Sequence, residues 1–274
     1  MNKFTCIFLF IMIIFLGSCS TAPKNTGDVY KLRSYAEKGL EDANKLMVQG
    51  DYKNAEKLLI EHKKSAILSD DSSLIARVCL SMGNVQFFLN EIDKAFAEWD
   101  MAIAEARKTG NSELISISIV FRAKGSLLSK RKGADEVLKE ADKEGANIKS
   151  NALYVAFTWQ VKGLAQRALG EWVKAEDAFK KSLAIHEKEK ALENASYDWY
   201  TIASIRFLAK NPDGAIKALE SAIVLDRRAE NSWGLAASYR AMGDVYSEMA
   251  GKEKEAAQAY ERAGRIHAAL GKDE

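Results

Sequence analysis

Cysteine is scarce in this chain, and only one of its cysteines lies beyond the first 20 residues. Cys6 and Cys19 both lie in that amino-terminal stretch, which leaves Cys79 without a disulfide partner in the rest of the chain. Cys79 occupies a position that holds a large aromatic residue in other copies of the repeat described below. We therefore expect a small, buried, apolar thiol and not a reactive one.

Histidine is equally scarce, and the residues that carry catalysis do not occur in recognisable patterns. His62, His186 and His267 are far apart in the sequence. His186-Glu187 begins like the HExxH pattern of zinc proteases, but Lys190 stands where the second histidine is needed. There is no Gly-rich phosphate loop, no G-x-S-x-G elbow and no strand pattern to position either. The sequence predicts a protein that is not an enzyme and needs no metal or cofactor.

A strong charge of one sign is also missing. The 40 basic and 38 acidic residues give a net charge of +2, and removal of the segment that holds Lys3 lowers it to +1. A nucleic-acid partner would require a concentrated basic face. We therefore expect no nucleic-acid binding.

Residues 1–18 have the features of a lipoprotein signal peptide. Lys3 precedes an apolar run from Phe4 to Leu16, which is short for a membrane span. Leu16-Gly17-Ser18-Cys19 resembles the bacterial lipobox, which implies cleavage before Cys19 and acylation of its thiol and new amino group. Two or more acyl chains anchor a protein stably to a bilayer. The alternative is an ordinary secretory signal with a chance cysteine.

Residues 19–27 form the predicted tether between the lipid and the folded part. The stretch from Ser20 to Gly27 has turn-forming residues and no apolar periodicity, and its flexible reach is roughly 15 Å. The folded part is therefore expected to lie close to the bilayer without entering it. Because Ser20, not an aspartate, follows the lipobox cysteine, the enteric sorting pattern favours the periplasmic face of the outer membrane, within the bacterial cell envelope.

The rest of the chain is organised around a repeated helical hairpin, which is clearest in the stretch from Trp159 to His186, WQVKGLAQRALGEWVKAEDAFKKSLAIH. Ala175, Phe179 and Ser182 fall at i, i+4 and i+7, which places small, large and small side chains on one helical stripe. Gly163 supplies the matching small contact on the preceding helix. The unit is therefore a helix, a tight turn and an antiparallel helix.

This pattern recurs about six times, at intervals of 39–41 residues. The alanine of the second helix recurs at Ala55, Ala95, Ala134, Ala175, Ala215 and Ala256. The small residue of the first helix recurs at Ala43, Gly83, Gly125, Gly163, Ala203 and Gly243. In the third copy nine residues separate the two positions, against 12 or 13 elsewhere, which predicts a shortened third turn.

These positions resemble the signature of the tetratricopeptide repeat (TPR), a ladder of Gly/Ala, aromatic and Ala positions on paired helices. The resemblance covers roughly residues 28–270. It implies an all-α domain over residues 28–274, a right-handed α-solenoid of about six antiparallel hairpins. The period is about 40 residues instead of about 34. The extra residues lie between hairpins, as in the longer repeats of adaptor proteins that bind extended peptides, and they predict longer helices.

In this family the first helices line the concave side, and the resemblance implies that the residue after each small position is exposed there. These residues are Asn44, Asn84, Ser126, Leu164, Ser204 and Asp244. The same register adds Arg77, Phe87, Arg122, Gln160, Arg167, Tyr197, Tyr200, Phe207 and Arg240. Short polar groups can hydrogen-bond an extended peptide, while aromatics and arginines can anchor its side chains. Alternatively, Phe87, Tyr200 and Phe207 are rotated into the core.

The leading hypothesis is a lipid-anchored scaffold or adaptor that binds an extended, somewhat acidic protein segment outside the cytoplasm. The carboxylate clamp of chaperone-binding TPR proteins is not expected, because Leu40 and Leu80 stand where its lysine would be. Two alternatives remain open: a subunit of an envelope assembly or secretion machine, and a solute-handling partner of a periplasmic substrate-binding protein. The sequence identifies neither the partner nor the oligomeric state.

Overall fold

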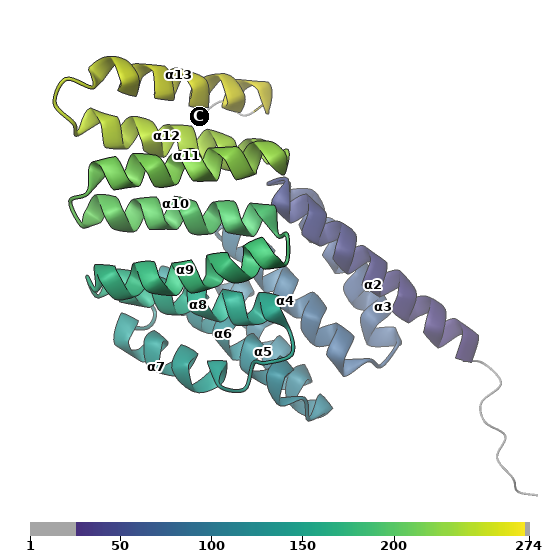
Figure 1. The fold of residues 1–274 in the computed structure, drawn as a ribbon. Coiled ribbons are helices and arrows are strands. Elements are labelled where there is room, and N and C mark those ends of the chain that lie inside the picture. Colours follow the sequence, from purple (N-terminus) through teal and green to yellow (C-terminus); the bar gives the residue numbers. More distant parts are fainter. Residues whose placement is uncertain (1–25, 272–274) are drawn as a thin grey trace, which may run out of the picture.

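The computed structural model describes residues 26–271, so the predicted signal peptide, Cys19 and most of the predicted tether lie outside the described residues. Within that range the chain forms twelve α-helices and no strand (Figure 1). They are α2 (Thr26–Val48), α3 (Tyr52–Leu68), α4 (Ser72–Phe88), α5 (Ile92–Thr109), α6 (Ser112–Leu128), α7 (Ala134–Gly145), α8 (Ala152–Ala168), α9 (Trp172–Lys188), α10 (Leu192–Leu208), α11 (Pro212–Arg228), α12 (Ser232–Ser247) and α13 (Glu253–Ala269). None of these helices is long and apolar enough to cross a membrane.

The helices pack in pairs along the sequence, from α2/α3 to α12/α13, and each hairpin stacks on the next (Figure 1). The second helix of one hairpin also packs against the first helix of the following one. Successive first helices touch one another more extensively than successive second helices do. The stack is therefore curved, with the first helices on its concave side. The predicted all-α solenoid is confirmed.

Close contacts at the small positions hold each hairpin together. Ala175, Phe179 and Ser182 on α9 are fully buried, as their stripe predicts. A Cβ atom placed on Gly163 of α8 would lie 2.6 Å from the Phe179 ring, so a hydrogen is all that fits there. Because dense packing leaves no spare volume, the pattern of small and large residues sets how closely α8 and α9 approach.

The third hairpin, α6/α7, departs from the predicted register. The helices α4, α6, α8 and α10 begin at 40-residue intervals, which makes the buried Ala123, and not Gly125, the small position of α6. The turn between α6 and α7 spans residues 129–133, two more than the turn at 169–171, so the predicted shortened turn is wrong. In α7, Val137 and Ala141 are fully buried, whereas Ala134 is partly exposed.

The first and sixth hairpins meet, so the solenoid curves back on itself. Gly50, in the turn after α2, lies against Trp233 at the start of α12; a Cβ atom on Gly50 would be 2.6 Å from Trp233 Nε1. A cleft of about 370 Å³ beside this contact is lined by Lys45 and Gln49 on one side and by Glu193 and the α11–α12 joint on the other. Figure 1 shows the carboxyl end of α2 reaching the ends of α11 and α12.

Candidate partner-binding groove

The concave groove is lined by one row of residues, each directly after the small position of a first helix. In the observed register this row is Asn44, Asn84, Lys124, Leu164, Ser204 and Asp244. Lys124 replaces the predicted Ser126, which is buried and donates its hydroxyl to the carbonyl oxygen of Arg122 within α6 (2.9 Å). The groove therefore carries a cation where a short neutral side chain was expected.

Lys124 lies among aromatic rings from neighbouring first helices. Its Nζ is 5.1 Å from the ring centroid of Phe157 on α8 and 5.7 Å from that of Tyr197 on α10. Phe157 in turn stacks on Phe121 of α6, with centroids 4.1 Å apart. Within residues 26–271 Lys124 makes no ion pair. The predicted Tyr197 thus lies in the groove, next to an amine held over aromatic faces by cation–π attraction.

An aromatic cavity of about 190 Å³ opens between α10 and α12. The structure brings four predicted residues together in its walls: Tyr200, Ser204, Phe207 and Asp244. Tyr200 and Phe207 are partly buried and also pack on the core, so they are neither fully exposed nor rotated away from the groove. We call this space the aromatic cavity. It is wide enough for one apolar side chain.

Charged groups converge on Tyr200 at the edge of the aromatic cavity. Burial raises the pKa of its phenol, and the nearby Asp244 carboxylate raises the pKa further, whereas Arg167 and Arg240 oppose that rise. Arg167 on α8 also donates from Nη1 to Ser204 Oγ on α10 (3.2 Å). The predicted arginines, serine and tyrosine of α8, α10 and α12 therefore form one continuous polar and aromatic surface.

A second space, the basic cavity, lies between the turn after α6 and the end of α8. Four cationic residues line its volume of about 560 Å³, together with Leu127 and Leu164, and no acidic residue does. The four are Lys130, Arg131, Lys132 and Arg167. The first three lie in the turn that was predicted to be shortened, so they were not predicted as groove residues. The run Lys130-Arg131-Lys132 is nevertheless a visible basic cluster in the sequence.

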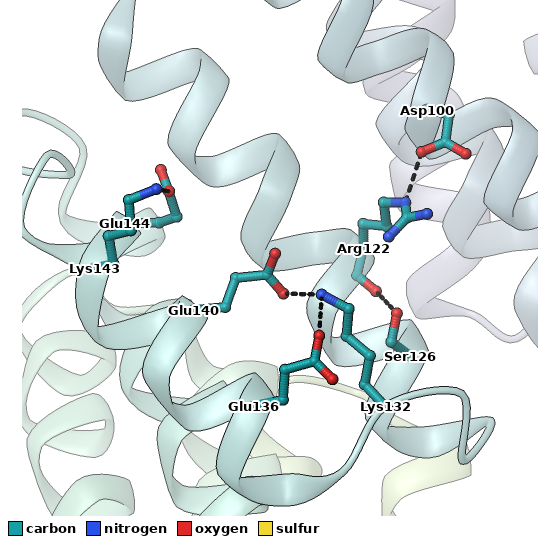
Figure 2. Close-up of polar contacts among 8 residues, drawn as sticks. All are labelled: Asp100, Arg122, Ser126, Lys132, Glu136, Glu140, Lys143 and Glu144. Atoms are coloured by element: carbon teal, nitrogen blue, oxygen red, sulfur yellow. Dashed lines mark hydrogen bonds and ion pairs between the residues drawn. The ribbon is translucent and has the colours of Figure 1, made fainter.

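Two of these cations have partners and two are available. Arg131 pairs with Asp93. Figure 2 shows Lys132, whose Nζ lies 3.1 Å from Glu136 and 3.0 Å from Glu140. Lys130 and Arg167 form no ion pair with any residue between 26 and 271. A cation without a counter-ion is stabilised more by a partner's negative charge than one that is already paired. Lys130 and Arg167 are therefore the candidates for contact with a partner.

Arg122, a predicted groove residue, faces the other side of α6. Its Nε donates to Asp100 Oδ1 on α5 (2.6 Å), and it lines a cleft between the second helices α5 and α7 (Figure 2). A register error of two residues rotates a helical position by about 200°. That rotation exchanges Arg122 for Lys124 in the groove, so the placement of Arg122 there is wrong.

Gln160 is buried between α8, α9 and α10 and does not line the groove surface. Its Nε2 donates to Asp198 Oδ1 (2.7 Å), and His186 Nδ1 lies 2.7 Å from Asp198 Oδ2. Asp198 is fully buried. A buried carboxylate needs such partners, so this network joins three helices. His186 is accordingly a packing residue.

The remaining predicted residues lie nearer the ends of the array. Arg77 on α4 pairs with Glu37 on α2 (3.5 Å), and Asn44 accepts a hydrogen bond from the Ser81 hydroxyl (2.9 Å). Phe87 is partly buried, with its ring centroid 5.8 Å from that of Trp99, which favours the alternative in which it packs on the core.

Asn84 is partly buried in α4 and Arg240 is exposed on α12. Within residues 26–271 no group of three or more His, Cys, Asp or Glu side chains is arranged to hold a metal ion.

Comparison with known proteins identifies the fold. No family model matches the chain, and no curated protein matches it significantly. Among solved structures, it is similar to a Rap protein complexed with Competence and Sporulation Factor (TM-score 0.64, 13% identity, 84% of this chain and 72% of that one). It is also similar to BtubC from P. vanneervenii (TM-score 0.59, 14% identity, 90% and 93% coverage).

A third similar structure is a signal transduction ATPase with a tetratricopeptide repeat sensor from Pyrococcus horikoshii (TM-score 0.53, 15% identity). The match covers 89% of this chain and 40% of that one. The chain therefore has a TPR-like α-solenoid fold.

Proposed function

We propose that this protein is a non-catalytic scaffold that holds an extended, acidic segment of a partner protein in its concave groove. The observation that carries the proposal is the gathering of Lys124, Lys130 and Arg167, cations without an acidic partner in residues 26–271, beside exposed aromatic surface on α8 and α10. Charge attraction would guide and orient the segment, and the aromatic rings would supply contact area. The Rap protein of similar fold, solved in complex with a factor, is consistent with this role.

The location of this scaffold is also a proposal. We infer that Cys19 is acylated and that a short tether holds the array beside a membrane of the bacterial envelope. The support is the Leu16-Gly17-Ser18-Cys19 sequence after an apolar run. In the same way, the 40-residue interval between first helices supports a long variant of the repeat.

Substitutions that replace a cationic side chain by a neutral one, on the groove side or on the opposite side of the first helices, test the groove. We expect Lys124→Gln combined with Arg167→Gln to weaken capture of the native partner by about tenfold or more at low salt, because two charges facing the partner are lost. Arg122→Gln is the matched control, since it removes one cation from the opposite side of α6. Circular dichroism should show unchanged helix content in both. Equal capture by the double variant, with loss in the control, would place the working surface on the second helices.

A further inference from the structure

We propose that the groove reads two features of its partner: a carboxylate bound in the basic cavity and a large apolar side chain bound in the aromatic cavity. This inference rests on the proposed peptide-binding function, and it specifies which two groups of the peptide are recognised and how far apart they lie. The two cavities are linked by Arg167, which lines the basic cavity and donates to Ser204 in the wall of the aromatic cavity. A segment bound at both places would therefore cross one unbroken surface.

The basic cavity fits a carboxylate because its charge is unbalanced. Lys130 and Arg167 have no acidic partner among residues 26–271, and Arg131 and Lys132 remain close by although each is already paired. Leu127 and Leu164 supply part of the apolar lining. A charge-assisted hydrogen bond to an arginine or lysine is roughly twice as strong as one between neutral groups. The carboxylate can belong to an Asp or Glu side chain or to a chain terminus.

The aromatic cavity fits an apolar side chain because its walls and floor are mostly carbon. Its apolar lining includes Tyr200 and Phe207 of α10, Leu219 of α11 and Val245 of α12. Its volume of about 190 Å³ suits one aromatic or branched aliphatic group. Ser204 and Asp244 also line the aromatic cavity. Ser204 accepts a hydrogen bond from Arg167, and Asp244 accepts one from the Tyr260 hydroxyl (2.8 Å). Each keeps acceptor capacity for the backbone of an extended segment.

The spacing of the two features follows from helix geometry. The basic cavity lies between α6 and α8, and the aromatic cavity lies between α10 and α12, two first-helix positions further along. Directly packed helices are about 8–10 Å apart, and α8 and α10 are joined through side chains such as Arg167 and Ser204, so the cavities lie at least roughly 16–20 Å from each other. An extended chain rises about 3.3 Å per residue. The carboxylate and the apolar side chain should therefore be about five residues apart or more.

A series of synthetic peptides tests this pattern against the purified chain from Ser20 onward. Each labelled peptide has an Ala/Ser backbone, one Glu and one Phe, with their separation varied from two to nine residues and both ends blocked. A second arm replaces the Glu by Gln and leaves a free terminal carboxylate. Fluorescence polarisation should show tightest binding at one separation of about five residues or more, and weaker binding at the shorter separations. In the first arm, Glu→Gln in the peptide should weaken binding about tenfold. The arm that binds more tightly identifies the source of the carboxylate.

Two matched lysines in the protein make the test specific. Lys130 and Lys210 both have a positive φ in the turn of a hairpin (58° and 64°), and the equivalent turn residue after α4 is Asn90. Lys130→Asn should reduce the preference for Glu over Gln, because it removes from the basic cavity one of the two charges left unpaired within residues 26–271, at a position where asparagine is tolerated. Lys210→Asn, outside that cavity, should leave the preference unchanged. Phe207→Ala should weaken binding of the Phe peptide without changing the preference for Glu.

Three results would overturn the two-cavity proposal. The first is no binding by any peptide in the series. The second is equal affinity for the Glu and Gln peptides of the first arm together with no gain from the free terminal carboxylate of the second. The third is equal losses in Lys130→Asn and Lys210→Asn. The groove itself is tested separately, by capture of the native partner. If Lys124→Gln with Arg167→Gln still impairs that capture while the peptides show no preference, the groove stands and the two-cavity pattern is wrong. If neither experiment responds, both proposals fail.

Discussion

Trp99 is clamped between two glycines on successive first helices, and this arrangement makes the packing of the array testable. A Cβ atom on Gly83 of α4 would lie 2.4 Å from Trp99 Nε1, and one on Gly125 of α6 would lie 2.2 Å from the other end of the ring. The ring is 2% exposed. Because a shift away from one glycine moves the ring toward the other, the usual relief of a tight contact is blocked.

Gly83→Ala should therefore destabilise the protein. Replacing a helical glycine by alanine gains about 1 kcal/mol of helix propensity. Overpacking costs about 1–3 kcal/mol, and the blocked ring places this site at the upper end of that range. We expect a net loss of about 1–2 kcal/mol in the free energy of unfolding, measured by urea titration followed by circular dichroism.

Gly264→Ala on α13 is the matched control, because a Cβ atom there meets nothing within 4 Å. This variant should gain up to about 1 kcal/mol from propensity alone. In a double-mutant cycle, Trp99→Leu should cost less in the Gly83→Ala background than in the parent, with a coupling energy of about 1 kcal/mol or more. If Gly83→Ala proved as stabilising as Gly264→Ala, the close packing of α4, α5 and α6 around Trp99 would be refuted.

Three further predictions concern other parts of the chain. Cys19→Ala should leave an unprocessed precursor that takes up no labelled fatty acid in intact cells, and normal processing and membrane retention of this variant would refute the lipobox interpretation. Asp198→Ala should cost about 2–4 kcal/mol in the free energy of unfolding, because it leaves the buried His186 and Gln160 without their shared partner, whereas Asp177→Ala at an exposed site should change it by less than about 0.5 kcal/mol. Burial raises the pKa of Asp226, so its contribution to stability is greatest below the ordinary aspartate pKa of about 3.9 and is lost as the pH rises through the raised value. Unfolding titrations across that interval should show this loss in the parent and not in Asp226→Asn.

The hairpin pattern was predictable from sequence wherever the turns have a constant length. In the fourth and fifth hairpins the turns at 169–171 and 209–211 both have three residues, so Gly163 with Ala175 and Ala203 with Ala215 share one separation. The small and large side chains of these hairpins follow directly from dense packing, and a pattern search finds them.

The predicted register of the third hairpin was wrong because two small residues, Gly125 and Ala123, both fit the same position of the pattern. Gly125 is a more conspicuous match than Ala123, but it meets Trp99 of the preceding hairpin and not a residue of α7. The choice between them depends on the length of the α6–α7 turn, which no local propensity fixes. From this one error came the misplacement of Arg122 and Ser126 and the omission of Lys124.

Other features depend on three-dimensional arrangement and had no local signal. The contact of Gly50 with Trp233 arises from small rotations accumulated over six hairpins, so no local sequence pattern predicts it. The burial of Gln160 depends on a carboxylate, Asp198, that belongs to the next hairpin. A polar residue on a helix is usually expected at the surface, and only the partner reveals that it is buried.

Site-specific photocrosslinking in intact cells tests the central claim most directly. A benzophenone amino acid would replace Asn84 or Asp244 in the concave row, and, as the control, Val224, an exposed residue on the second helix α11. A partner held along the groove should give the same discrete adduct from both concave positions and none from Val224. An adduct formed at Val224 and absent from both concave positions would contradict the account and place the partner on the convex side.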